Sequence, residues 1–152
     1  MANIGTALSS EVAAVIGTVD PDALTAAAHT SDYVSAADFE SIMAVIMAGT
    51  LGSSATLDAK LVQATDSGGT GSKDITGKAI TQLTQAGTDS DKQAIINCRA
   101  EELDLANSFT HVALTITVGT AASDGGGLLL GLNPRMAPAS DNDLASVAEI
   151  VS

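Results

Sequence analysis

Short runs of alternating residues constrain the fold of this chain more than any other feature. In His111–Val118, large apolar residues alternate with His, Ala and Thr at a period of two. Thr56–Thr65 and Gln93–Ala100 alternate in the same way, and Leu128–Leu132 is a short run that is apolar throughout. A period of two places one set of side chains on a buried face and the other set in solvent. These runs predict β-strands.

Turn-forming segments separate the predicted strands. Asp66–Ser72, Asp89–Asp91 and Ser123–Gly127 are rich in Gly, Ser and Asp, which favour turns. Short strands that are broken by turns roughly every ten residues are typical of a β-sandwich or a barrel. The 152 residues suffice for one domain with a sizeable core. We therefore expect an all-β protein with a single sandwich domain.

The segment Ala37–Ala48 fits two local structures. As a helix it places Phe39, Ile42, Met43, Ile46 and Met47 on one face, before a stop at Gly49. As a strand it has two apolar faces, one of which carries Met43, Val45 and Met47. Both faces of such a strand would need to be covered. The local pattern alone does not decide between helix and strand.

The two ends lack clean alternation, so we expect arms outside the sandwich. Residues 1–24 form the predicted N-terminal arm, with a short helix over Glu11–Ile16 capped by Ser9 or Ser10. The predicted sandwich domain is 25–132. Residues 133–152 form the predicted extended C-terminal arm, which contains Pro134 and Pro138. Its later apolar residues are spaced as in a helix, with Asp143 as the N-cap: Leu144, Val147, Ile150 and Val151.

Large aromatic side chains are scarce. The chain has 27 Ala, and its only aromatic residues are Tyr33, Phe39 and Phe109. Each large ring would bury about 150–250 Å², so a core without rings buries less area per residue. Together with the doubly apolar pattern of Phe39–Ala48, this predicts that the core is completed between subunits. We expect a homotrimer, in which the ends contact neighbours and Arg135 pairs with an acid of another chain.

Charge excludes several classes of partner. With 18 acidic and 6 basic residues, the chain has a formal net charge of −12. Nucleic acids and anionic membrane surfaces require clustered Lys and Arg, so neither is expected as a partner. The longest apolar run, Ile42–Ala48, is too short to span a bilayer. Residues 1–17 lack the basic region of a signal peptide, and Cys98 has no disulfide partner. We expect synthesis and folding in a reducing host cytoplasm.

No combination of residues in the sequence has the spacing of a catalytic, metal or cofactor site. His29 and His111 have no second ligand at metal-binding spacing. Cys98 falls on the inward face of its strand, where we expect a structural thiol. Asp20–Asp22 and Asp141–Asp143 pair carboxylates two residues apart, but they lack the Gly and Glu of an EF-hand loop. We expect these acids to cap turns, and we predict no enzyme activity.

An enzyme or a carbohydrate-binding module is an alternative. The spacing of the acidic residues is compatible with paired carboxylates for glycoside hydrolysis. Sugar sites usually offer aromatic platforms, however, and this chain has few rings. A buried carboxylate pair or a metal in a cleft would favour this class.

The order of the motifs resembles a known family. The segments that carry the resemblance are Thr30–Val34, the apolar run that ends at Gly49, Leu57–Asp66, Asp74–Ala79, Ile95–Ala100, His111–Gly119 and Leu128–Gly131. In this order they resemble the head decoration, or cement, proteins of tailed bacteriophages and prophages. The resemblance covers roughly residues 25–152. The acidic, aromatic-poor composition departs from the family pattern and would suit a salt-adapted phage.

The resemblance implies a fold and a role. It implies a jelly-roll-like β-sandwich that trimerises on the outer surface of a capsid, and it favours a strand for Ala37–Ala48. Its partners would be copies of itself and the phage major capsid protein. A cement protein bridges neighbouring capsid subunits, and contacts at many sites suit that task through multivalency. A tail or baseplate protein with a β-sandwich is the alternative within virions.

Overall fold

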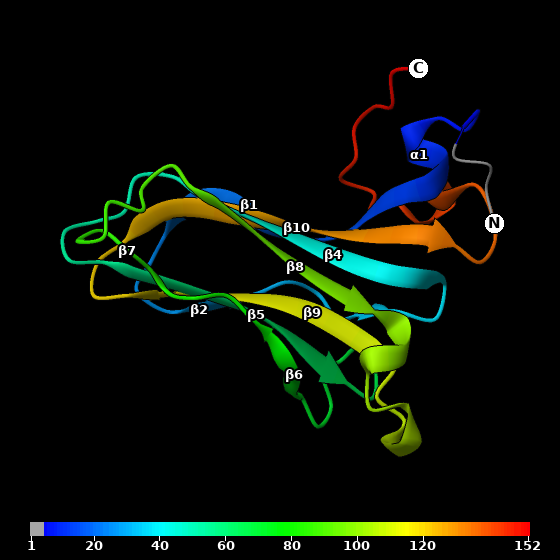
Figure 1. Cartoon of the computed structure of the whole chain (residues 1–152), viewed down its shortest axis with the longest axis horizontal. Helices are drawn as coiled ribbons and strands as arrows, with labels where there is room; N and C mark the ends of the chain where they lie inside the picture. The colour runs from blue at the N-terminus through cyan, green and yellow to red at the C-terminus, as the bar shows by residue number, and fades with distance from the viewer. Residues whose placement is uncertain (1–4) are drawn as a thin grey trace.

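Two antiparallel β-sheets pack face to face in the computed structural model, which describes residues 5–152 (Figure 1). The strands of the first sheet are β1 (Ala13–Leu24), β4 (Phe39–Ala48), β8 (Gln93–Arg99) and β10 (Ser123–Pro134). The strands of the second sheet are β2 (Ala28–Thr30), β3 (Val34–Ser35), β5 (Thr56–Ala64), β6 (Lys73–Ala79), β7 (Leu83–Thr84) and β9 (His111–Gly119). The helical turns are α1 (Ser9–Val12), η1 (Ala100–Glu102), η2 (Leu105–Asn107) and η3 (Ala139–Asn142). None of the helices within residues 5–152 is long and apolar enough to cross a bilayer.

The strand order is that of a jelly roll. The first sheet runs β1-β10-β4-β8 and the second runs β2-β9-β5-β6, and every pairing is antiparallel. The short β3 continues the edge formed by β2, because both pair with β9, and β7 continues the edge formed by β6 along β5. Counted as eight positions, the orders are 1-8-3-6 and 2-7-4-5, as two interleaved Greek keys require. The predicted all-β, jelly-roll-like sandwich is confirmed.

The strand alternative for Ala37–Ala48 is correct. Phe39–Ala48 forms β4, which lies between β10 and β8 in the first sheet. Ile42, Ala44 and Ile46 are fully buried between the sheets. Their neighbours Met43 and Val45 are only half-buried on the outer side. One face of this strand therefore belongs to the core, and the other reaches the surface of the monomer.

Large apolar side chains that lie over glycines fill part of the core. A Cβ atom at Gly127 would lie 2.7 Å from Leu114 Cδ2, and one at Gly131 would lie 2.6 Å from the Phe39 ring. Both glycines belong to β10, so larger side chains from β9 and β4 occupy the space above them. This close approach explains why Ser123–Gly127, which the sequence predicts as a turn, is part of a strand. The most deeply buried side chains are Phe39, Ile42, Ile46, Leu57, Leu61, Cys98, Val112, Leu114, Ile116 and Leu129.

The N-terminal segment differs from the predicted arm. Only Ser9–Val12 is helical, whereas Ala13–Leu24 is an edge strand paired with β10 along its length. Its register shifts between Val15 and Gly17 and again between Val19 and Asp22. Each bulge adds a residue, so the period of two is interrupted twice. The alternation that would have revealed the strand is therefore missing from the sequence.

The C-terminal segment folds back onto the same chain. The main-chain N–H of Val15 donates to the Asp143 carboxylate at 2.6 Å, and the Leu144 N–H donates to the Val15 carbonyl at 2.9 Å. Ala139 of η3 is completely buried. The predicted helix after Asp143 is wrong, because this carboxylate caps the bulge of β1 instead of a helix. Ile150 and Val151 remain exposed.

We predict that Asp143→Ala destabilises the fold by about 1–3 kcal/mol, because it leaves a main-chain donor of β1 without its charged acceptor. The free energy of unfolding in urea measures the effect. Asp141→Ala is the matched control, since it removes an exposed carboxylate two residues earlier and should change stability by less than about 0.5 kcal/mol. Equal stability of the two variants would show that the contact between Asp143 and Val15 does not hold the segment.

Candidate binding face

The outer surface of the first sheet is apolar. Antiparallel pairing places Thr18, Leu128, Val45 and Ile95 in one row across its four strands. The next row contains Val15, Leu130, Met43 and Asn97. Neither row contains a charged residue. We define the apolar face by its outward-pointing apolar residues, which are Val15, Met43, Val45, Met47, Ile95, Leu128 and Leu130.

Several side chains of the apolar face are open to solvent. Ile95 is 59% exposed, Met47 is 54% exposed and Leu128 is 36% exposed. Isolated exposed apolar residues are common, but a contiguous group on one face marks an interaction surface. These residues come from three neighbouring strands: Leu128 and Ile95 lie in one row on either side of Val45, and Met47 lies two residues further along β4. The face is therefore a candidate contact surface.

The outer surface of the second sheet is polar. The Thr30 and Thr115 hydroxyls are hydrogen-bonded at 2.9 Å, and Lys60 forms an ion pair with Asp74 at 2.7 Å. The Gln82 side-chain amide donates to Asp58 at 2.7 Å. These groups satisfy one another within the chain and are suited to contact with water. The two outer faces of the sandwich thus differ in chemical character.

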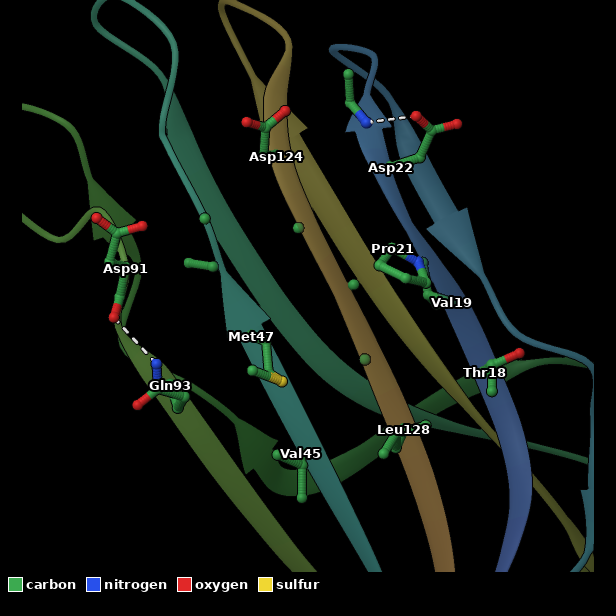
Figure 2. Close-up of a pocket in the computed structure, with 16 residues that line it drawn as sticks. Thr18, Val19, Pro21, Asp22, Val45, Met47, Asp91, Gln93, Asp124 and Leu128 are labelled. Carbon is green, nitrogen blue, oxygen red and sulfur yellow. Dashed lines mark hydrogen bonds between the residues drawn. The ribbon is translucent and has the colours of Figure 1, made fainter. Parts of the chain in front are cut away.

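A hollow of about 850 Å³ lies at one end of the apolar face (Figure 2). Val45, Met47 and Leu128 line it from the strands, and Pro21 lines it from the second bulge of β1. The backbone of Gly125–Gly127 forms part of the surface. A Cβ at Gly126 would lie 2.9 Å from Pro21 Cα, so a glycine is needed where Pro21 of β1 lies against β10. The bulge and the glycines together shape the hollow.

Three carboxylates border the hollow. Figure 2 shows Asp22, Asp91 and Asp124 on three separate strands or loops around its open end. Asp22 accepts a hydrogen bond from the Ala23 N–H at 2.7 Å. No ion pair formed within residues 5–152 includes any of the three. The result is an apolar floor with an acidic rim.

Lys92 and Lys73 are paired with carboxylates that do not belong to the rim of the hollow. Lys92, which follows Asp91 in the sequence, binds Asp89 at 2.6 Å. The hydrogen bond from Lys92 and that from the Thr84 N–H lower the pKa of Asp89. Lys73 binds Asp104, and hydrogen bonds from Lys73 and Asn107 lower the pKa of that carboxyl. These cations therefore do not neutralise the rim of the hollow.

Of the two sequence-predicted acidic clusters, Asp20–Asp22 makes local contacts, whereas Asp143 of the second cluster contacts a residue distant in the sequence. Asp20 accepts from the Thr18 hydroxyl at 3.0 Å, and Asp22 accepts from its neighbouring main-chain N–H. Asp143 accepts from Val15 of β1. Within residues 5–152 no three His, Cys, Asp or Glu side chains form a group that could hold a metal ion. Asp22 also lies on the rim of the hollow, a position that its sequence context did not predict.

The histidines contact nearby threonines. The His29 Nε2 atom lies 3.0 Å from the Thr25 carbonyl oxygen, and His111 Nδ1 lies 3.0 Å from the Thr110 hydroxyl. His29 is on β2 and His111 begins β9. Each contact joins residues at most four positions apart. The structure therefore gives both rings local hydrogen-bonding partners.

Two of the three aromatic rings hold a loop. The Tyr33 hydroxyl is hydrogen-bonded to Ser72 at 2.5 Å, and a Cβ at Gly69 would lie 2.7 Å from the Tyr33 ring. The Lys73 ammonium lies 4.0 Å from the centre of the Phe109 ring. Phe39 is buried in the core. These contacts engage both surface rings with their own chain.

Comparisons with known proteins give structural likeness only. Neither protein-family models nor curated proteins match this chain. A chain of Broad Bean Stain Virus is 13% identical, with 71% of this chain and 60% of that chain aligned at a TM-score of 0.43. A chain of the infectious bursal disease virus Gx strain is 12% identical, with 84% and 33% aligned at 0.42. A family 35 carbohydrate-binding module is 13% identical, with 81% and 77% aligned at 0.36.

This chain thus spans less than two thirds of the Broad Bean Stain Virus chain that it matches. The identities are low and every TM-score given above is below 0.5. The jelly-roll assignment accordingly rests on the strand order of this chain itself.

Burial gives Cys98 the properties of a structural residue. Its side chain is 1% exposed and opposes Ile42 across the first sheet. Burial raises the pKa of the thiol to about 11. The thiol is therefore neutral at ordinary pH, and a neutral thiol is a poor nucleophile.

We predict that folded protein resists thiol-modifying reagents at mildly alkaline pH, whereas protein unfolded in guanidinium reacts fully.

Cys98→Ala should cost only about 1 kcal/mol of stability. Because folding raises the pKa of the thiol, the neutral thiol contributes its full share to the free energy of unfolding below the pKa of the unfolded state. That contribution declines as the pH rises towards about 11. Rapid labelling of the folded protein would contradict a structural role.

Proposed function

We propose that this chain is a structural virion protein that decorates and stabilises a tailed-phage capsid. It binds to the outer surface of the capsid and bridges neighbouring major capsid subunits. The observation that carries the proposal is the contrast between the two outer faces of the sandwich. A protein that lies on a shell needs one face for attachment and another for solvent. The end of the apolar face that carries Val45, Met47 and Leu128 supplies the first. The surface with Lys60, Asp74 and Thr115 supplies the second.

The sequence resemblance to phage decoration proteins supports the same proposal. It concerns the order of segments that the structure places in β3–β6 and β8–β10. The jelly-roll topology agrees with what that resemblance implies. A cement protein acts by binding, so its role is consistent with residues whose contacts serve the fold, such as Cys98 and His111.

Self-association into a homotrimer is the second part of the proposal. Val15, Met43 and Leu130 form an uncharged row that a single subunit leaves half-buried. Closed cyclic contact between copies would cover such a surface without leaving a free edge. A trimer would also bring three attachment sites to the shell, which strengthens binding through effective concentration.

The positions of the three aromatic side chains do not support the carbohydrate-binding alternative. Tyr33 and Phe109 contact the 66–73 segment of their own chain, and Phe39 is buried. A sugar platform needs an accessible ring face.

A tail or baseplate location is distinguished from a head location by separating the two parts of the virion.

We predict that the purified chain cosediments with empty heads of the phage that encodes it, saturably and at a fixed number of copies per particle. Decorated heads should withstand heating better than bare heads, because bound protein ties neighbouring subunits together. Isolated tails are the control and should not retain the chain. Binding to tails alone would support the alternative virion location and refute the head proposal.

We also predict a particle with three times the 15.1 kDa chain mass in solution. Light scattering coupled to gel filtration measures this mass over a range of concentrations. A substitution in the uncharged row, Met43→Gln, should shift the mass towards that of one chain. Asn97→Gln is its control in the same row, because it leaves a polar residue polar. A monomer mass for the unchanged chain at micromolar concentration would contradict the trimer.

A further inference from the structure

We propose that the hollow at the end of the apolar face binds a segment of the shell protein in which an apolar side chain is flanked by Lys or Arg. This inference rests on the proposed function, because it names the chemistry of the shell partner. It assigns the hollow to a different chain, not to a second copy of this one. The floor of the hollow, its rim and the charge of the whole protein support this assignment.

The floor of the hollow suits an apolar side chain. Met47 and Leu128 are both accessible, and the unbranched Met47 side chain is able to adjust to different shapes. The glycines of β10 leave this part of the sheet without bulky side chains. A volume of about 850 Å³ exceeds one side chain and is large enough for several residues of an extended segment. Concave apolar surfaces of this size are typical of binding sites.

The rim selects a basic neighbour for that side chain. Asp22, Asp91 and Asp124 are exposed, and none is paired with a base within residues 5–152. They surround the hollow and do not converge as a metal site would require. Lys or Arg residues on either side of the inserted side chain would lie near these carboxylates. Complementary charge then sets orientation and accelerates docking.

A second copy of this chain would fit the hollow poorly. The chain has a formal net charge of −12, and its 6 basic residues are outnumbered three to one by 18 acidic residues. Five ion pairs within residues 5–152 already use Lys60, Lys73, Lys78, Lys92 and Arg99. Two-fold contact through the hollow would bring the same three carboxylates of each copy together. A basic segment of another protein avoids this repulsion.

The direct test is a titration of isotopically labelled full-length protein followed by amide NMR shifts. The probe is an acetylated Lys-Leu-Lys-Leu-Arg peptide in low-salt buffer. One control peptide replaces Leu with Ser, and the other replaces Lys and Arg with Glu. We expect shifts centred on Met47, Asp91, Gln93, Asp124 and Leu128 with the first peptide only. Equal shifts with the Ser peptide, shifts elsewhere, or none would overturn the inference.

Amino-acid substitutions distinguish the contribution of the floor to peptide binding from that of the rim. Met47→Gln combined with Leu128→Gln should weaken peptide binding at least tenfold while leaving the fold intact, because both side chains are exposed. Leu105→Gln is the matched control, since Leu105 is also 54% exposed but lies on η2. Its binding should equal that of the unchanged protein. Equal losses from floor and control variants would overturn the assignment to the hollow.

The triple variant Asp22→Asn, Asp91→Asn and Asp124→Asn should also weaken binding and remove most of its salt dependence. Its control replaces Asp38, Glu40 and Glu149, which are exposed elsewhere, with Asn or Gln. Unchanged affinity in the rim variant would overturn the role of charge. Peptide binding without binding to empty heads would refute the proposed function and the shell protein as the partner, but not the apolar and basic chemistry of the segment that fits the hollow. The reverse result would refute the inference alone.

Discussion

Large side chains of β9 and β4 occupy the space that glycines leave on β10, and the rest of the fold depends on this fit. Leu114 of β9 lies over Gly127, and the Phe39 ring lies over Gly131, both on β10. Contacts such as that of Leu114 compensate for the scarcity of aromatic residues, because aliphatic chains pack closely when a backbone lies beneath them. They also fix the register of β10 between β1 and β4. A slip by one residue would place leucines where the glycines are needed.

The register of β10 determines what the outer surface presents. With Gly127, Leu129 and Gly131 directed inward, the alternation directs Leu128 and Leu130 outward. The same pairing aligns them with Val45 and Met43 of β4. The apolar face is therefore a consequence of how the core is packed. Its charge-free rows follow from the composition of β4 and β10. The acidic rim comes from the first residues of β10, the second bulge of β1 and the turn before β8.

The two ends of the chain support this arrangement. The bulges of β1 let Pro21 cross above Gly126, which creates one wall of the hollow. Asp143 and Leu144 then satisfy the main chain of Val15 on the exposed edge of the same strand. An uncovered edge invites pairing with other chains. The C-terminal segment protects part of this edge, so new contacts are directed to the face of the sheet.

Local periodicity in the sequence determined the strands at Thr56–Ala64, Gln93–Arg99 and His111–Gly119, since a strand with one buried face displays its own alternation. Composition also determined the shortage of rings and the excess of acid. The tertiary structure alone decided that β1 is a strand, because its bulges erase the period of two. It alone decided that residues 123–127 belong to β10, because the need for glycine arises from side chains of distant strands. The sequence likewise did not reveal the hollow. Asp22, Asp91 and Asp124 are far apart along the chain, and only strand pairing within the first sheet places them around one hollow.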